Sequence, residues 1–177
     1  MTIIGQDRAG LVDSVARLVA EHGGNWLESR MSRLGGQFAG ILRIEVPSAN
    51  ESALLAALKG LSSEGLTVVA QADSPVQKRA ASRPNTLEIV GQDRPGIVRQ
   101  IFRVLASFGV NVEELHTECA SAPMSGETLF KARARLSIPA ECDTDQLRQT
   151  LEKIAADLIV DVTLGDVESQ TAAPRPS

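Results

Sequence analysis

A short loop that could bind a small anion occurs twice in the chain. Its first copy is Gly5-Gln6-Asp7-Arg8-Ala9-Gly10, and its second is Gly91-Gln92-Asp93-Arg94-Pro95-Gly96. Each copy lies between the end of a predicted strand and the start of a predicted helix. Backbone N–H groups lack partners there, and the helix dipole adds about half a positive charge. Such a position attracts an anion, for example the carboxylate of an amino acid.

Three polar positions recur in both copies of the segment: Asp7 and Asp93, Arg8 and Arg94, and Asn25 and Asn111. The aspartate could hold an ammonium group, and the arginine could pair with a carboxylate. The asparagine, at the start of the next predicted strand, can both donate and accept hydrogen bonds. Together these side chains would suit a zwitterion.

The same loop also has a purely structural interpretation. An aspartate ahead of a helix is a common N-cap, and the first glycine could simply permit a tight turn. The last glycine could let the helix approach the sheet, and the arginine could be solvated. The middle glycine of a dinucleotide-binding loop is missing, which argues against that ligand. Duplication copies structural and functional residues alike, so the repeat leaves both interpretations open.

The duplication extends well beyond the loop. With an offset of 86, residues 3–28 align with residues 89–114, as IIGQDRAGLVDSVARLVAEHGGNWLE against IVGQDRPGIVRQIFRVLASFGVNVEE. A repeat this long predicts two tandem domains, each with its own core. We expect a first domain at 1–72, a polar linker at 73–85, a second domain at 86–166 and a disordered tail at 167–177.

The hydrophobic periodicity predicts the same β-α-β-β-α-β order in each copy. Strands are expected at 3–4, 25–34, 38–46 and 66–70, and at 87–90, 111–119, 128–138 and 158–164. A capping box at Ser48–Glu51 predicts the start of one second helix, and Asp143 or Thr144 the start of the other. This order suits two helices on one face of a four-stranded antiparallel sheet, an α+β fold.

Two features distinguish the copies. The first predicted strand is shorter than its counterpart, so either the start is trimmed or that edge is weaker. The second copy inserts residues 120–126 where the first has a tight glycine turn. A basic stripe in the second copy, at Lys131, Arg133 and Arg135, fits either the solvated side of a sheet or contact with an acidic partner.

The composition argues against several classes of function. The net charge is -4 and aromatic residues make up 3%, which disfavours nucleic-acid binding and an anionic membrane surface. Cys119 and Cys142 lack metal-site spacing, and His22 and His116 are better explained by packing or a strand face. No membrane span or signal peptide is evident. We expect a cytoplasmic protein without catalytic residues, metal or cofactor.

The quoted motifs resemble those of tandem ACT domains. G-Q-D-R-x-G-[IL]-V followed by G-x-N occurs in both copies, and the segments at 25–38 and 122–130 are similar to those of the glycine cleavage system transcriptional repressor group. The resemblance implies a ferredoxin-like fold and ligand binding by the loops between domains. Carried over by position, the binding residues are Asp7, Arg8, Ala9, Gly10 and Asn25, and Asp93, Arg94, Pro95, Gly96 and Asn111. Relatives that bind amino acids often have asparagine where this chain has Asp7 and Asp93.

These observations lead to the hypothesis of a non-enzymatic regulator. A small amino acid such as glycine or serine would bind the loops of a homodimer, since unpaired sheet edges accept strands. The resemblance further implies repression of glycine cleavage genes through a DNA-binding activator, without direct contact with nucleic acid or membrane. Two alternatives remain: an interaction module that binds no ligand, and an acylphosphatase-like hydrolase that uses the loop and Arg94.

Overall fold

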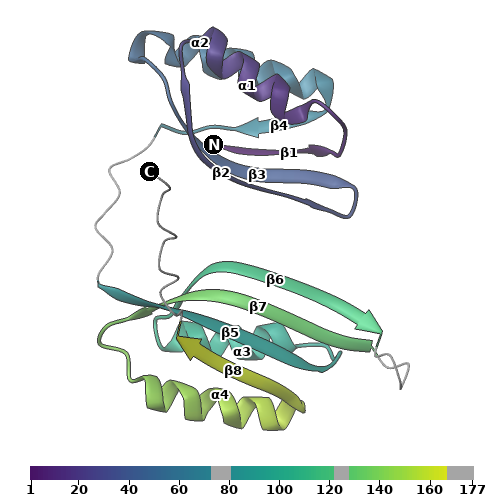
Figure 1. Ribbon diagram of the computed structural model, residues 1–177, viewed down its shortest axis with the longest axis vertical. Helices are drawn as coiled ribbons and strands as arrows, with labels where there is room; N and C mark the ends of the chain where they lie inside the picture. Colours follow the sequence, from purple (N-terminus) through teal and green to yellow (C-terminus); the bar gives the residue numbers. More distant parts are fainter. Residues whose placement is uncertain (73–80, 122–127, 167–177) are drawn as a thin grey trace, which may run out of the picture. The chain divides into compact units, whose positions relative to one another are not determined.

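The computed structural model describes residues 1–72, 81–121 and 128–166. The chain divides into two compact units, Met1–Val76 and Gln77–Ser177. Each unit has the predicted β-α-β-β-α-β order, with both helices on one face of its sheet (Figure 1). The predicted α+β, ferredoxin-like fold is therefore confirmed in each half.

The first unit has a four-stranded sheet in which β1 and β4 are the short strands. The elements are β1 (Thr2–Gln6), α1 (Leu11–Glu21), β2 (Asn25–Leu34), β3 (Gln37–Glu45), α2 (Ser48–Gly60), the 3-10 turn η1 (Leu61–Glu64) and β4 (Leu66–Val69). The strand order is β2-β3-β1-β4, and every pairing is antiparallel. Strand β1 therefore lies between β3 and β4, and β2 forms one edge.

The second unit repeats this arrangement with longer strands. Its elements are β5 (Ser82–Gln92), α3 (Ile97–Ser107), β6 (Asn111–Ser121), β7 (Thr128–Pro139), α4 (Thr144–Leu158) and β8 (Val160–Asp166). The strand order is β6-β7-β5-β8. Residues 82–85, which the sequence analysis assigned to the linker, pair with β7. The rest of the predicted linker up to residue 80, and the predicted tail, lie outside the described residues.

Each unit has a separate hydrophobic core between its sheet and its helices. The first contains Ile3, Leu11, Val15, Val19, Leu42, Leu54, Leu58, Leu61 and Leu66. The second is larger and includes Leu87, Ile89, Ile101, Leu105, Leu136, Ile138 and Leu151. The two cores share no residue, so each sheet buries its apolar side chains under its own pair of helices.

The opposite faces of the two sheets differ in chemistry. On the second sheet the basic stripe is neutralised by acidic side chains: Lys131 with Glu118 at 3.8 Å, Arg133 with Glu88 at 2.9 Å and Arg135 with Glu114 at 3.6 Å. These contacts agree with the expected solvated side of a sheet. On the first sheet, Ile4, Ile41 and Val69 are exposed.

Only one of the two predicted helix caps forms. Asp143 caps α4, because its Oδ1 accepts hydrogen bonds from the Asp145 and Gln146 amides at 3.1 and 3.0 Å. The capping box at Ser48 is wrong: Pro47 is the N-cap of α2, and no side-chain cap bond forms. Instead, Asn50 of this segment donates to the His22 carbonyl at 2.9 Å, which ties α2 to the end of α1.

Candidate functional site

The last glycine of each loop is the N-cap of the following helix. Gly10 and Gly96 have φ values of 90° and 97°, and neither helix start has a side-chain cap. The interpretation of Asp7 and Asp93 as N-caps is therefore wrong. These φ values lie in the left-handed region that glycine adopts without a Cβ penalty. The first N–H groups of α1 and α3 are left without side-chain partners at the loop.

The first glycine of each loop has a different role. Gly5 and Gly91 lie within β1 and β5, so they do not form tight turns. A Cβ at Gly5 would lie 2.6 Å from the carbonyl oxygen of Gly65, and one at Gly91 would lie 2.5 Å from Val160 Cγ1. These glycines let the neighbouring edge strand approach closely, just before the chain enters the loop.

Each loop lines a shallow pocket at the start of its helix. The first pocket, of about 330 Å³, is lined by Asp7, Arg8, Gly10, Leu11, Val12, Asp13 and Phe38. The second, of about 440 Å³, is lined by Asp93, Arg94, Gly96, Ile97, Val98, Arg99 and Phe130. The predicted Ala9 and Pro95 lie in the loops but not among these lining residues.

Two components of these pockets were not predicted from the sequence. The rings of Phe38 and Phe130 come from the strand beside the loop, where they pair with Gly5 and Gly91. The other missed component is the charge in the first turn of the helix. Asp13 lines the first pocket and Arg99 the second. The sequence did contain a signal for this difference, because Asp13 and Arg99 occupy equivalent positions of the repeat and have opposite charges.

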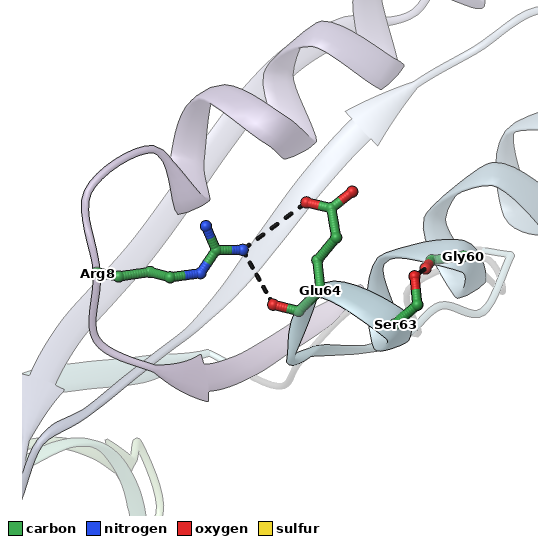
Figure 2. Close-up of polar contacts among 4 residues, drawn as sticks. All are labelled: Arg8, Gly60, Ser63 and Glu64. Atoms are coloured by element: carbon green, nitrogen blue, oxygen red, sulfur yellow. Dashed lines mark hydrogen bonds and ion pairs between the residues drawn. The ribbon is translucent and has the colours of Figure 1, made fainter.

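Both charges of the first loop are already engaged. The Asp7 carboxylate pairs with Arg33 of β2 at 2.6 Å, and the Asp7 amide donates to the Gly36 carbonyl at 2.9 Å. Arg8 donates to the Glu64 carbonyl oxygen at 3.0 Å, and its guanidinium lies 3.7 Å from the Glu64 carboxylate (Figure 2). The loop is thus fastened to the β2–β3 hairpin and to η1.

The second loop is held mainly through its backbone. The Asp93 amide donates to the Thr128 carbonyl at 2.9 Å, and Arg94 donates to the Gln92 side chain at 3.0 Å. Within the described residues, the Asp93 carboxylate makes no hydrogen bond or ion pair. With Arg99 in place of Asp13, this pocket has two cationic side chains and one carboxylate, the reverse of the first pocket. It therefore attracts a carboxylate more strongly.

The two asparagines do not join the loops within their own domains. Asn25 pairs with Glu45, whereas Arg33, which contacts Asp7, lies near the other end of β2. About 26 Å of strand separates Asn25 from Arg33. Asn111 similarly begins β6, opposite Ser137. The sequence correctly placed the asparagines at the strand starts, but these starts lie at the sheet end remote from the loop.

The cysteines and histidines form no second centre in the described part of the chain. Cys119 is exposed, whereas Cys142 is partly covered, and burial raises the pKa of its thiol. His22 Nδ1 lies 2.8 Å from the Leu18 carbonyl oxygen, so the imidazole is part of the end of α1. Within residues 1–72, 81–121 and 128–166, no three His, Cys, Asp or Glu side chains are grouped to hold a metal ion.

None of the helices in the described ranges is long and apolar enough to cross a membrane.

Comparison with known proteins matches both halves of the chain to one type of domain. A family model described as an ACT domain matches residues 1–71, and a second model with the same description matches residues 85–158. The glycine cleavage system transcriptional repressor of Escherichia coli (strain K12) is 22% identical over 165 residues, covering 89% of this chain and 84% of that protein. A protein of the same name from Shigella flexneri matches with the same identity and coverage.

A solved structure shares the whole architecture. An unknown protein from Galdieria sulphuraria has a TM-score of 0.77 and 30% sequence identity, and the match covers 94% of this chain and 96% of that one. The similarity therefore spans both repeats together.

Proposed function

Because the chain belongs to the ACT-domain family, with one ACT domain in each half, we propose that it is a regulatory protein that senses an amino acid. The observation that carries this proposal is the pair of equivalent pockets, each formed by a left-handed glycine, a helix N-terminus and a phenylalanine. Helix N-termini bind carboxylates through their free N–H groups. These features support a binding role rather than catalysis.

The second loop is the better candidate for the amino acid. Its Asp93 carboxylate is available for the ligand ammonium group, and Arg94 and Arg99 add positive charge for the carboxylate. In the first loop, a ligand would have to displace the ion pairs of Asp7 with Arg33 and of Arg8 with Glu64. A pocket of about 440 Å³ open to solvent suits a small amino acid such as glycine or serine.

The proposed output is a change in protein–protein contact. The acidic, aromatic-poor chain favours a protein target over nucleic acid. The Escherichia coli relative is a glycine cleavage system transcriptional repressor. In line with the resemblance of the sequence to that group, the target would be a DNA-binding activator of glycine cleavage genes in the cytoplasm, and the chain would act as a corepressor. Among the described strands, β2 and β6 lie at sheet edges and offer unpaired backbone groups for a homodimer, in which Asn25 and Asn111 could approach the loop of another domain.

Calorimetry of the full chain with each amino acid tests the sensor proposal. We expect saturable binding of one small amino acid, and Asp93→Ala should weaken it about tenfold through loss of a charge-assisted hydrogen bond. The matched variant Asp7→Ala should change the affinity less than about threefold, because that carboxylate is already paired.

Two results would count against the proposal. If no amino acid binds, or if neither aspartate variant affects binding, the loops are not the sensing site. Capture of a protein partner that is insensitive to every amino acid would then favour the ligand-independent interaction module.

A further inference from the structure

The open face of the first sheet, the side turned away from α1 and α2, carries large apolar side chains (Figure 1). Ile4 of β1, Ile41 of β3 and Val69 of β4 are 47%, 66% and 57% exposed. Residues that pair directly across strands point to the same face. The register of β3, β1 and β4 therefore defines a patch that we call the apolar face: Thr2, Ile4, Ala39, Ile41, Thr67 and Val69.

The second domain carries charges at four equivalent positions of its own open face. Gly5 and Gly91 are equivalent in the repeat, and their pairing partners on either side set the correspondence of the other strands. Thr2, Ala39, Ile41 and Thr67 correspond in this way to Glu88, Lys131, Arg133 and Asp161. A sheet face in water is normally polar, as in the second domain. The first domain lacks all four charges, so its open face suits contact with another apolar surface.

Large and small side chains alternate on the two central strands of the apolar face. Ile4 of β1 pairs with Ala39 of β3, and Ile41 of β3 pairs with Thr2 of β1. Each isoleucine therefore projects beside a small neighbour. Sheets that pack face to face lie about 10 Å apart and interdigitate such side chains.

A second copy of the same face fits this alternation. A twofold axis that runs parallel to the strands, between β1 and β3, places β1 of one copy opposite β3 of the other. Ile4 then meets Ala39 of the second copy, and Ile41 meets Thr2 of the second copy. Because both contacts occur twice about the axis, the surface is complementary to itself, as a symmetric dimer interface requires.

The residues around the apolar face agree with the same axis. Gln6 and Gln37 pair at one end of this face and would meet each other's copy, where each amide can donate and accept. Arg30 of the edge strand β2 pairs with Ile41 and would lie opposite Val69 of the second copy. Its methylene groups can cover that valine while the guanidinium stays at the rim.

The size of the face predicts a weak dimer. Four strands about 4.8 Å apart and three rows of side chains about 6.8 Å apart give a footprint of about 400 Å² on each copy. The pair therefore falls in the class of small, reversible interfaces. The open face of the second domain fits less well as an occupant, because its ion pairs at Lys131 and Arg133 would lose solvent.

We propose that the apolar face is a homodimer interface, in which two copies of the chain stack their first sheets about this axis. The contact is separate from pairing of the edge strands β2 and β6. It does not depend on amino-acid binding and so goes beyond the proposed function.

Sedimentation equilibrium of the full chain tests the interface. The average mass should rise with concentration, with a dissociation constant of about 10 to 100 μM. Ile4→Lys should weaken this association more than about tenfold, because an ammonium group would be buried opposite an uncharged surface. Val90→Lys is the matched control, since Val90 is the equivalent residue of the second sheet, and it should have no effect.

A second variant guards against misfolding of the first. Thr2→Glu combined with Ile41→Arg copies the Glu88–Arg133 ion pair, which the second sheet carries at 2.9 Å. This variant should keep the circular dichroism spectrum of the parent chain and should lose the association.

A charge-free exchange tests the position of the axis. Ala39→Ile should weaken the dimer more than about tenfold, because it would overlap Ile4 of the second copy. Adding Ile4→Ala returns a large residue opposite a small one, so the double variant should recover to within about threefold of the parent.

The proposal is overturned if the parent chain stays monomeric up to about 1 mM, well above the expected dissociation constant. It is also overturned if Ile4→Lys associates as strongly as the parent, which would assign the dimer to the edge strands. No recovery in the double variant would exclude the axis between β1 and β3. Amino-acid calorimetry on Ile4→Lys is a separate measurement, so failure of the interface and failure of the sensor are distinguishable.

Discussion

At the scale of single residues, four glycines shape the two loops for two different reasons. Gly10 and Gly96 have positive φ, but a Cβ at Gly10 would meet nothing within 4 Å. Gly5 and Gly91 have ordinary strand geometry, but a Cβ at either position would overlap the neighbouring strand. The first pair therefore provides conformational freedom, and the second pair provides space.

Alanine substitution should separate these two roles. Gly10→Ala should lower the free energy of unfolding by about 1 kcal/mol, the cost of a left-handed conformation. Gly5→Ala should cost about 3 kcal/mol, because the contact at 2.6 Å is to the backbone oxygen of Gly65 and the strands must separate. Urea denaturation measures both variants. Equal destabilisation would show that steric space at Gly5 is not the limiting factor.

The Cys142 thiol should make stability depend on alkaline pH. Burial raises its pKa above the ordinary value of 9.0; Arg83 opposes this shift, and Asp143 and Glu141 add to it. As the pH rises, this thiol therefore ionises in the unfolded chain before it ionises in the folded one. Its contribution to the free energy of unfolding is complete below pH 9.0 and is lost as the pH rises through the raised pKa.

Urea denaturation at about pH 8 and about pH 10.5 tests this dependence. The loss of stability between the two conditions should be smaller in Cys142→Ala than in the parent chain. An identical loss in both proteins would exclude Cys142 as a source of the pH dependence.

At the scale of elements, matching helices begin in different ways in the two domains. Helix α4 has a side-chain cap at Asp143, whereas α2 begins after Pro47 without one. The loops also differ in how they are fastened. Arg8 joins the first loop to η1, whereas Arg94 bonds within its own loop. The duplicated elements therefore keep the fold while their local contacts have diverged.

Removing the two predicted caps provides a matched comparison. Asp143→Ala should lower the free energy of unfolding by about 1 kcal/mol, because the Asp145 and Gln146 amides lose their acceptor. Ser48→Ala should change it by less than about 0.5 kcal/mol, since α2 has no side-chain cap. Thermal unfolding followed by circular dichroism measures both. A larger effect at Ser48 would contradict the observed start of α2.

At the scale of the whole molecule, one duplicated architecture supports two different surfaces. The open face of the first sheet exposes Ile4, Ile41 and Val69, whereas the open face of the second carries the ion pairs of Lys131, Arg133 and Arg135. The second loop also has the more cationic pocket. The two loop pockets therefore differ in charge although the fold around them is the same.

The separate cores should let the two domains unfold independently. Trp26 is the only tryptophan of the chain, and it packs against the first core. Leu58→Ala should destabilise the first domain by about 3 kcal/mol and shift the midpoint of urea unfolding followed by tryptophan fluorescence. Leu105→Ala, an equally buried site in the second core, should shift the circular dichroism transition but not the fluorescence midpoint. A shift of the fluorescence midpoint in Leu105→Ala would show that the domains unfold together.

The sequence by itself determined the duplication, the order of the elements, a start of α4 at Asp143 or Thr144 and the position of each loop ahead of a helix. These features depend on residues close together in the chain, through periodicity, turn chemistry and the repeat. Only the tertiary structure decided that Gly5 and Gly91 make room for a neighbouring strand, that Phe38 and Phe130 line the pockets, and that Asn25 and Asn111 lie at the remote end of each sheet. Each of these depends on which distant strands pair and in which register.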